Sequence, residues 1–248
     1  MQLNQASVMI VEDEPALCEI IGAWFARIAA RVLTAGNGAE ALKLLAGNHV
    51  DLIISDLRMP VMDGVTLLKR ILISGPPSPS VIFISGFSDI DAREAYALGA
   101  EGFLQKPMDR QELLQAVKQS LLARNELWSN QMPETPSTVL DLSYPSLATA
   151  LEQHKIAFGR GGFCIALPHQ LPEGPIKIHV EFTQDKQILE GSGIVRWTSR
   201  AEQQSGIELL YLTPASRQWF SAWIGQISTP AFIPASSSSG SFLDARSA

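Results

Sequence analysis

Up to about residue 125, the chain alternates between short apolar runs and segments whose apolar residues recur at helical spacing. The apolar runs predict buried strands at residues 7–11, 31–34, 52–55, 81–85 and 101–105. The helical pattern predicts helices at residues 16–28, 37–46, 63–73, 88–98 and 109–128. Strands that alternate with helices predict a doubly wound, five-stranded parallel α/β sheet with right-handed crossovers.

The pattern changes after residue 128. Residues 129–138 are polar, contain two prolines and lack periodicity, so they predict a linker. Residues 139–227 hold short alternating runs between turn residues, which predict a small antiparallel β-barrel with a C-terminal helix. Residues 228–248 include a serine-rich stretch and predict a disordered tail. The expected domains are therefore residues 1–128 and 139–227.

Composition narrows the class of protein. The 248 residues are 46% hydrophobic, enough for a substantial core, and carry a formal net charge of −6. This negative balance argues against a large nucleic-acid interface. No stretch predicts a membrane span or a signal peptide. Cys18 and Cys164 lack metal-ligand spacing and are read as small buried residues in a reducing cytoplasm.

Chemistry-bearing residues follow four of the five predicted strands. Glu12 and Asp13 follow the first strand, Asp56 the third, Ser85 ends the fourth, and Lys106 follows the fifth. Because parallel strands place their carboxyl ends at one edge of a sheet, we expect these side chains to cluster. Three carboxylates repel one another unless a cation joins them, and oxygen ligands favour Mg²⁺. An aspartate beside Mg²⁺ and a lysine is a nucleophile suited to phosphoryl transfer.

Residues 7–125 resemble the receiver domain of two-component response regulators, which is CheY-like. The resemblance is carried by the acidic pair Glu12-Asp13, the run from Asp56 through Met59-Pro60 to Asp63-Gly64, and by Ser85 and Lys106-Pro107. It implies the flavodoxin-like strand order. It also implies that Asp56 is the phosphoacceptor and that Lys106 and Ser85 assist it.

The same resemblance implies further roles. Glu12, Asp13, Asp56 and the backbone carbonyl of Arg58 would hold Mg²⁺, while Ser85 and Phe103 would act as the switch pair. The alternative is a flavodoxin-like domain whose acidic edge no longer accepts phosphate. Retention of both Asp56 and Lys106 disfavours that alternative.

Residues 139–227 resemble a PilZ domain. The resemblance is carried by Gly161-Gly162-Phe163, by Gly193 to Trp197, by Gly206 to Leu209 and by the closing helix. Members of that family often bind cyclic di-GMP through an Arg-x-x-x-Arg pair and an Asp/Asn-x-Ser-x-x-Gly loop. In this chain Ala157 and Gly159 occupy the acidic and serine positions of the loop, and residues 129–160 contain no such arginine pair.

The dinucleotide is therefore disfavoured as a ligand. Arg160 is left as a weak candidate for a phosphate contact, and we expect this degenerate PilZ domain to act through protein contacts.

These observations predict a response regulator that a histidine kinase or a phosphotransfer protein phosphorylates on Asp56, with output to a protein that the sequence does not identify. The chain is not expected to be an enzyme beyond Mg²⁺-dependent self-phosphorylation and dephosphorylation. The alternative is a cyclic di-GMP effector with a non-standard PilZ site. A DNA-binding regulator ranks last, because residues 129–248 show no helix-turn-helix and carry eight basic against ten acidic side chains.

Overall fold

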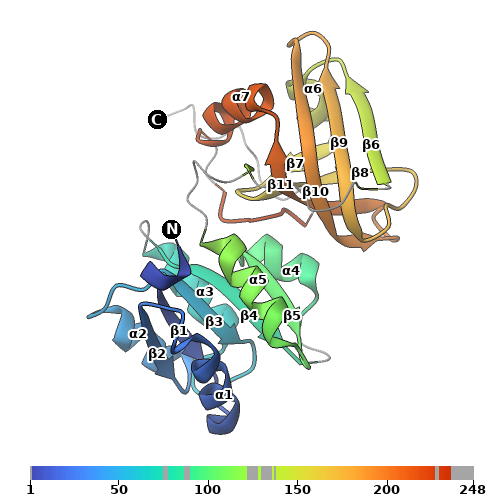
Figure 1. Ribbon diagram of the computed structural model, residues 1–248. Coiled ribbons are helices and arrows are strands. Elements are labelled where there is room, and N and C mark those ends of the chain that lie inside the picture. Colours follow the sequence, from blue (N-terminus) through green and yellow to red (C-terminus); the bar gives the residue numbers. More distant parts are fainter. Residues whose placement is uncertain are drawn as a thin grey trace, which may run out of the picture. The chain divides into compact units, whose positions relative to one another are not determined.

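The computed structural model describes residues 2–74, 78–86, 90–121, 128–129, 136, 138–226 and 229–235. The chain divides into two compact units, Met1–Arg124 and Asn125–Ala248, each with its own sheet (Figure 1). Within the described residues, no helix has the length and apolar character needed to cross a membrane.

The N-terminal unit is built on a five-stranded parallel sheet. Its order, β2-β1-β3-β4-β5, is that of the flavodoxin-like fold and confirms the predicted parallel α/β class. The strands are β1 (Ser7–Val11), β2 (Arg31–Ala35), β3 (Leu52–Asp56), β4 (Ser80–Ser85) and β5 (Gly102–Gln105). The helices are η1 (Leu3–Gln5), α1 (Pro15–Phe25), α2 (Gly38–Leu45), α3 (Gly64–Ile73), α4 (Ala92–Leu98) and α5 (Arg110–Ser120).

Helices cover both faces of this sheet (Figure 1). One face packs against α1 and α5, through residues such as Phe25 and Leu113. The other packs against α2, α3 and α4, through residues such as Leu67 and Ala95. Because the central strands are buried on both sides, their sequences are almost wholly apolar, which explains why the apolar runs predict them so well.

Side-chain caps fix where four helices of this unit begin. Each cap residue accepts a hydrogen bond from the backbone nitrogen three residues later, which satisfies an otherwise unpaired donor. The caps are Asn37, Asp63, Asp91 and Asp109. Helix α4 therefore begins after Asp91, later than the predicted start at residue 88; residues 88 and 89 lie outside the described part of the chain.

The second unit is a curled six-stranded sheet of order β6-β9-β10-β11-β8-β7 (Figure 1). It was predicted to be antiparallel, but its first pair, β6 with β9, is parallel, so the sheet is mixed. The strands are β6 (Thr138–Tyr144), β7 (Ile156–Phe158), β8 (Gly162–Ala166), β9 (Gly174–Phe182), β10 (Gln187–Ser199) and β11 (Gln204–Leu212). The helices are α6 (Leu147–Glu152) and α7 (Pro214–Ile224).

Aromatic side chains dominate the core of this unit. Phe220 of α7 lies against Phe158, with their ring centroids 5.2 Å apart, and against Trp128, at 5.1 Å. Helix α7 thus closes one side of the curled sheet, as the apolar face of the predicted C-terminal helix required.

Trp128 belongs to the second unit. The helical pattern assigned it to the last helix of the first domain, 1–128, but α5 ends at Ser120. Trp128 is buried in the core of the second unit, and its carbonyl accepts a hydrogen bond from the backbone nitrogen of Leu212 (2.8 Å). The spacing of Trp128 fits a helical pattern, but burial of its large indole in the core of the second unit decides where the residue lies. Most of the predicted linker 129–138 lies outside the described residues.

The predicted disordered tail, 228–248, is wrong for residues 229–235. Ala231, Phe232 and Ile233 are buried, and the segment is hydrogen-bonded to the turn between β7 and β8. An apolar Ala-Phe-Ile triplet between two prolines packs against the sheet although its flanks are polar. Residues 236–248 lie outside the described part of the chain.

Candidate functional site

Four strand ends meet at one edge of the N-terminal sheet. The parallel register pairs Val11 with Ser55, Asp56 with Ile84, and Ser85 with Gln105, so β1, β3, β4 and β5 end side by side. The backbone nitrogen of Lys106 donates to the carbonyl of Ser85 (2.7 Å), which holds the residue after β5 beside the end of β4. The Lys106-Pro107 peptide bond is cis.

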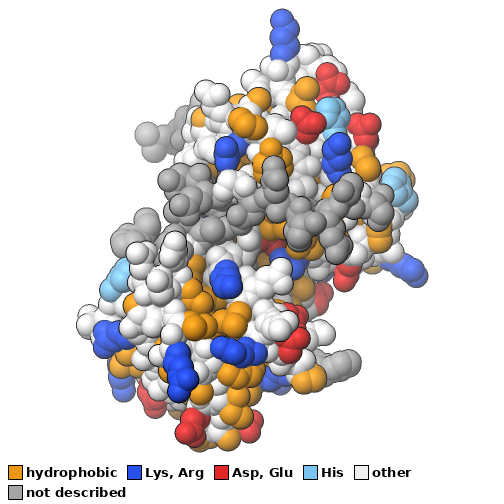
Figure 2. Space-filling model, viewed as in Figure 1, with side chains coloured by type: hydrophobic (Ala, Val, Ile, Leu, Met, Phe, Trp, Pro, Cys, Tyr) orange, Lys and Arg blue, Asp and Glu red, His pale blue; other side chains and the backbone are white. Residues whose placement is uncertain are grey.

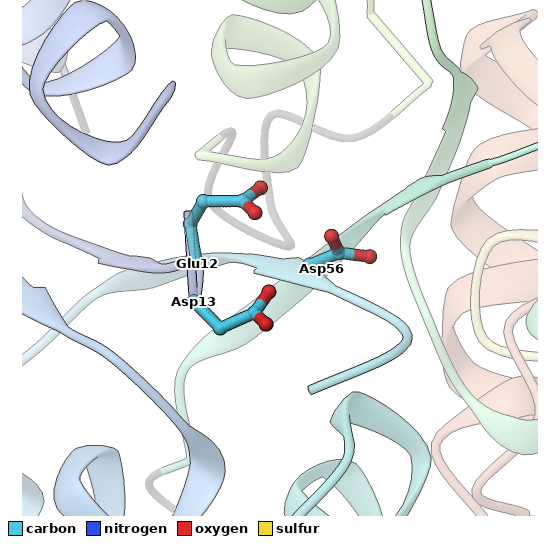
Figure 3. Close-up of side chains that lie close together, drawn as sticks. All are labelled: Glu12, Asp13 and Asp56. Atoms are coloured by element: carbon cyan, nitrogen blue, oxygen red, sulfur yellow. The ribbon is translucent and has the colours of Figure 1, made fainter. Parts of the chain in front are cut away.

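Three carboxylates gather at this edge. Glu12 and Asp13 project from the end of β1 toward Asp56 at the end of β3 (Figure 3). One oxygen from each of the three carboxylates lies within 4.8 Å of the others. Glu12 and Asp56 are buried, with 3% and 8% of their surfaces exposed, whereas Asp13 is exposed. Negative charge is therefore concentrated where water can screen little of it.

Lys106 joins two of these carboxylates. Its Nζ donates to Oε2 of Glu12 (2.9 Å) and to Oδ2 of Asp56 (2.5 Å). A single ammonium thus forms ion pairs with side chains from two strands that are not neighbours of β5 in the sheet. Charge-assisted hydrogen bonds of this length are among the stronger polar contacts in proteins.

Burial and charge shift the protonation of this cluster. Burial raises the pKa of Glu12, and the charge of Asp56 raises it further; the hydrogen bond from Lys106 acts in the opposite direction but is outweighed. Burial alone would lower the pKa of Lys106, but the hydrogen bonds that it donates to Asp56 and Glu12, and the charges of these carboxylates, raise it overall. Lys106 is therefore an ammonium at neutral pH.

The donor set fits a hard divalent cation. Lys106 pairs with two of the three carboxylates, which leaves an excess of negative charge at the edge of the sheet. All the ligand atoms are oxygens, the kind that Mg²⁺ prefers. Glu12, Asp13 and Asp56 are thus the residues that could hold such an ion.

Arg58 and an open cleft lie beside Asp56. The backbone nitrogen of Arg58 donates to Oδ1 of Asp56 (3.2 Å), while its side chain is exposed. The cleft, about 560 Å³ in volume, is lined by Asp13, Leu57, Arg58, Met59, Pro60, Asp63, Val65 and Ile90. Sequence reasoning missed the apolar part of this wall. The only indication in the sequence was that Val65 and Ile90 lie close along the chain to the loops that carry the polar residues.

Ser85 and Phe103, the predicted switch pair, lie at the same edge. Ser85 is fully buried, and its hydroxyl donates to the carbonyl of Gly86 (2.8 Å). Phe103 stands beside Phe83 in the register of β4 and β5 and is partly buried against the core under α2, α3 and α4. Their roles in switching stay predictions.

Arg160, the candidate ligand residue of the second unit, lies in the three-residue turn between β7 and β8. Its Nε donates to the carbonyl of Pro230 (3.2 Å), and its guanidinium lies 6.0 Å from the ring centroid of Phe232. The side chain thus contacts the segment 229–235, which sequence reasoning had assigned to the tail.

Gly64 allows the chain to pass close to Asp56. A Cβ atom at this position would collide with the carbonyl oxygen of Asp56 and would lie 3.0 Å from Oγ of Ser55. The backbone nitrogen of Gly64 also donates to the carbonyl of Leu57 (3.0 Å), which closes the loop after β3. The Asp-Gly pair at residues 63–64 therefore shapes the site as well as starting α3.

Comparison with known proteins assigns the N-terminal unit to a family. Residues 8–118 match the family model of the response regulator receiver domain. The transcriptional regulatory protein GlrR of Escherichia coli (strain K12) is 38% identical over 132 residues, which are 52% of this chain and 30% of that protein. The DNA-binding transcriptional regulator NtrC of the same strain is 36% identical over 120 residues, 48% of this chain and 25% of that protein. The chain thus spans less than a third of the length of these relatives.

Solved receiver structures align with the same part of the chain. The signal receiver domain of an HD domain-containing protein from Pseudomonas fluorescens Pf-5 is 33% identical, with 47% of this chain and 94% of that chain covered and a TM-score of 0.44. The chemotaxis response regulator CheY4 of Vibrio cholerae is 28% identical, with 47% and 99% covered and a TM-score of 0.43.

We expect Gly64→Ala to lower the free energy of unfolding of the N-terminal unit by about 1–3 kcal/mol, because the added methyl group must displace the end of β3. Gly22→Ala is the matched control. It lies within α1 with its nearest neighbour 3.8 Å away, and should stabilise by about 0.5–1 kcal/mol. Urea unfolding measures both variants. Equal stability of Gly64→Ala and the unchanged chain would contradict the proposed close approach.

Acidification should favour the N-terminal unit through Glu12. Because its pKa in the folded state is raised above the ordinary 4.5, the folded unit binds this proton more tightly than the unfolded chain does. The contribution of Glu12 to stability therefore falls as the pH rises from 4.5 through the folded pKa.

The check is urea unfolding against pH, without divalent cations, for the unchanged chain and Glu12→Gln. The stability of the unchanged chain minus that of the variant should decrease with rising pH. The exposed Glu19→Gln is the control. A difference between the unchanged chain and Glu12→Gln that grows with pH would refute this assignment.

Proposed function

We propose that this chain receives its signal as a phosphoryl group on Asp56, on the premise that residues 8–118 form the receiver domain of a response regulator. The observation that carries the proposal is the position of Asp56, which is buried and paired with Lys106 at an edge where four parallel strands end. Both groups that an acyl phosphate requires, a carboxylate nucleophile and a nearby fixed cation, are thereby together.

The donor in this proposal is a phosphohistidine on a kinase or phosphotransfer protein. A carboxylate oxygen of Asp56 forms a bond to phosphorus as the bond from phosphorus to the histidine nitrogen breaks. The bonding electrons leave with the imidazole, which then takes up a proton. Mg²⁺ held by Glu12, Asp13, Asp56 and the carbonyl of Arg58 would offset the negative charge of the transferred group.

Lys106 holds the new acyl phosphate in this scheme. Its ammonium already lies 2.5 Å from Oδ2 of Asp56, and its raised pKa keeps it charged. Ser85 would release the carbonyl of Gly86 and donate to the phosphoryl group, which carries strong acceptor oxygens. The resulting movement would reach Phe103 and change the surface formed by α4, β5 and α5.

The second unit is assigned the output role, as a PilZ-like domain that acts through protein contacts. In support, Gly161-Gly162-Phe163 opens β8, Gly193 to Trp197 lies in β10, Gly206 to Leu209 lies in β11, and α7 follows. Phosphorylation and dephosphorylation of Asp56 would then be the only chemistry of the chain, and no metabolite is turned over. We place the chain in the reducing cytoplasm, where cysteines are kept as thiols.

DNA binding is not part of the proposal. NtrC is described as a DNA-binding regulator, but the aligned residues cover a quarter of it. Basic and acidic side chains are interspersed over the described residues on the face shown in Figure 2, rather than gathered into a basic stripe.

Phosphorylation is tested by exposing the full chain to a radiolabelled acyl phosphate with Mg²⁺. We expect the label on the unchanged chain and only background on Asp56→Asn, because the amide cannot act as the nucleophile. Asp63→Asn is the matched control, since asparagine also caps α3 and the label should persist. Equal labelling of Asp56→Asn and the unchanged chain would refute the proposal.

Cyclic di-GMP is the alternative input. Ala157 in β7 and Gly159 in the turn that follows stand in place of the functional side chains, and residues 229–235 cover that turn. We therefore expect calorimetry of the full chain with cyclic di-GMP to show no binding. Micromolar binding that Arg160→Ala abolishes, and that the control Arg200→Ala preserves, would favour the alternative.

A further inference from the structure

Residues 229–235 are bound at one end by the turn between β7 and β8. The backbone nitrogens of Arg160 and Gly161 donate to the carbonyls of Ala231 (2.9 Å) and Phe232 (3.0 Å). The Nε of Arg160 donates to the carbonyl of Pro230 (3.2 Å). Three successive carbonyls of the segment therefore accept hydrogen bonds from three donors of one turn.

The other end is held beyond the far end of β8. With its amide nitrogen turned toward the surrounding acceptors, Gln204 donates to the carbonyl of Ala235 (3.0 Å). In the sheet Gln204 lies opposite Ala166, the last residue of β8, whereas Gly162 begins β8 at the turn. The segment 229–235 thus runs along β8 from one end to the other.

It lies on the face of the sheet opposite the main core. Phe163 and Ile165 of β8 belong to that core, so strand alternation turns Cys164 to the outer face. Cys164 is nevertheless only 1% exposed, and Phe232 and Ile233 of the segment are 7% and 0% exposed. The segment therefore fills an apolar site on the outer face of the sheet. We call this site, formed by Cys164 and the turn 159–161, the seat.

Two glycines form that seat. A Cβ atom on Gly159 would lie 2.8 Å from the carbonyl oxygen of Ala231 and would collide with the backbone of Phe232. A Cβ atom on Gly161 would collide with the ring of Phe232. The turn is thus shaped to admit a second backbone and one aromatic ring.

The chemistry of the seat is that of peptide recognition. It offers backbone and side-chain donors to main-chain carbonyls, and apolar space to an aromatic residue followed by an aliphatic one. As in other modes of peptide recognition, hydrogen bonds to the main chain supply affinity and side-chain pockets supply specificity. Pro230 and Pro234 lack the backbone N–H, so they bury no unpaired donor there.

We propose that this seat is a docking site for a short apolar peptide of a partner protein, and that residues 229–235 occupy it in cis and compete with that peptide. The partner segment presents carbonyls to Arg160 and Gly161, and an aromatic-aliphatic pair corresponding to Phe232 and Ile233. The inference rests on the proposed output through protein contacts, and it names the contact that such a partner makes.

Competition follows from tethering. A covalently attached segment has a high effective concentration, so a free peptide binds the unchanged chain poorly. Weakening the cis contact raises the fraction of chains with an open seat, and the apparent affinity for the free peptide rises by the same factor. Phe232→Ala weakens the cis segment without altering any residue that lines the seat.

The probe is a fluorescein-labelled peptide with the sequence of residues 229–235, and its anisotropy is measured with the full, unphosphorylated chain. We expect Phe232→Ala to bind this peptide at least about tenfold more tightly than the unchanged chain does. Adding Gly161→Ala should abolish binding, because the new methyl group occupies the position of the aromatic ring. Adding Gly47→Ala instead, where nothing lies within 4 Å, is the matched control and should leave binding unchanged.

Three results would overturn the proposal. The first is a folded Phe232→Ala chain, verified by circular dichroism, that binds the peptide no more tightly than the unchanged chain. The second is unfolding of the second unit by Phe232→Ala, which would make the segment part of the fold rather than a ligand. The third is a dimer, detected by light scattering, that Gly161→Ala dissociates, because a second copy would then supply the segment. Since no phosphate is present, failure of Asp56 labelling leaves this test unaffected.

Discussion

The ammonium of Lys106, held between Glu12 and Asp56, is the contact on which the N-terminal site depends. Two buried carboxylates a few ångströms apart are unfavourable without a partner cation, and burial already raises the pKa of Glu12. In the sheet, β3 and β4 separate β1 from β5, so the ion pairs form only when all four strands end at the same level. The positions of these charges therefore depend on the register of β1, β3, β4 and β5 in the sheet.

That dependence explains why the fold and the main site residues could be predicted from sequence. Strands buried on both faces must be apolar along their length, so a polar residue such as Asp56 or Lys106 marks the point where a strand ends. Once the sheet is known to be parallel, its topology brings these ends together. The shape of the neighbouring cleft did not follow, because the helical pattern around Val65 and Ile90 predicts helices but does not tell which of their side chains face Asp56.

The second unit was harder to predict for two reasons. Its strands pair across a curled sheet, so local alternation indicates strands but not their partners, and the parallel pairing of β6 with β9 left no trace in the pattern. Local composition also gave a wrong prediction for a segment whose structure depends on packing against the sheet. Phe232 and Ile233 form a brief apolar signal between prolines, next to a serine-rich stretch that dominated the interpretation.

The burial of Trp128 has a consequence for how such a chain could arise. A gene fusion that joins a receiver to an output module must leave each module with the side chains that complete its core. Here the indole that lies against Phe220 comes before β6, the first strand of the second unit, so a breakpoint after residue 128 would leave the core of that unit incomplete. A boundary that leaves the second unit with its complete core therefore has to lie before Trp128.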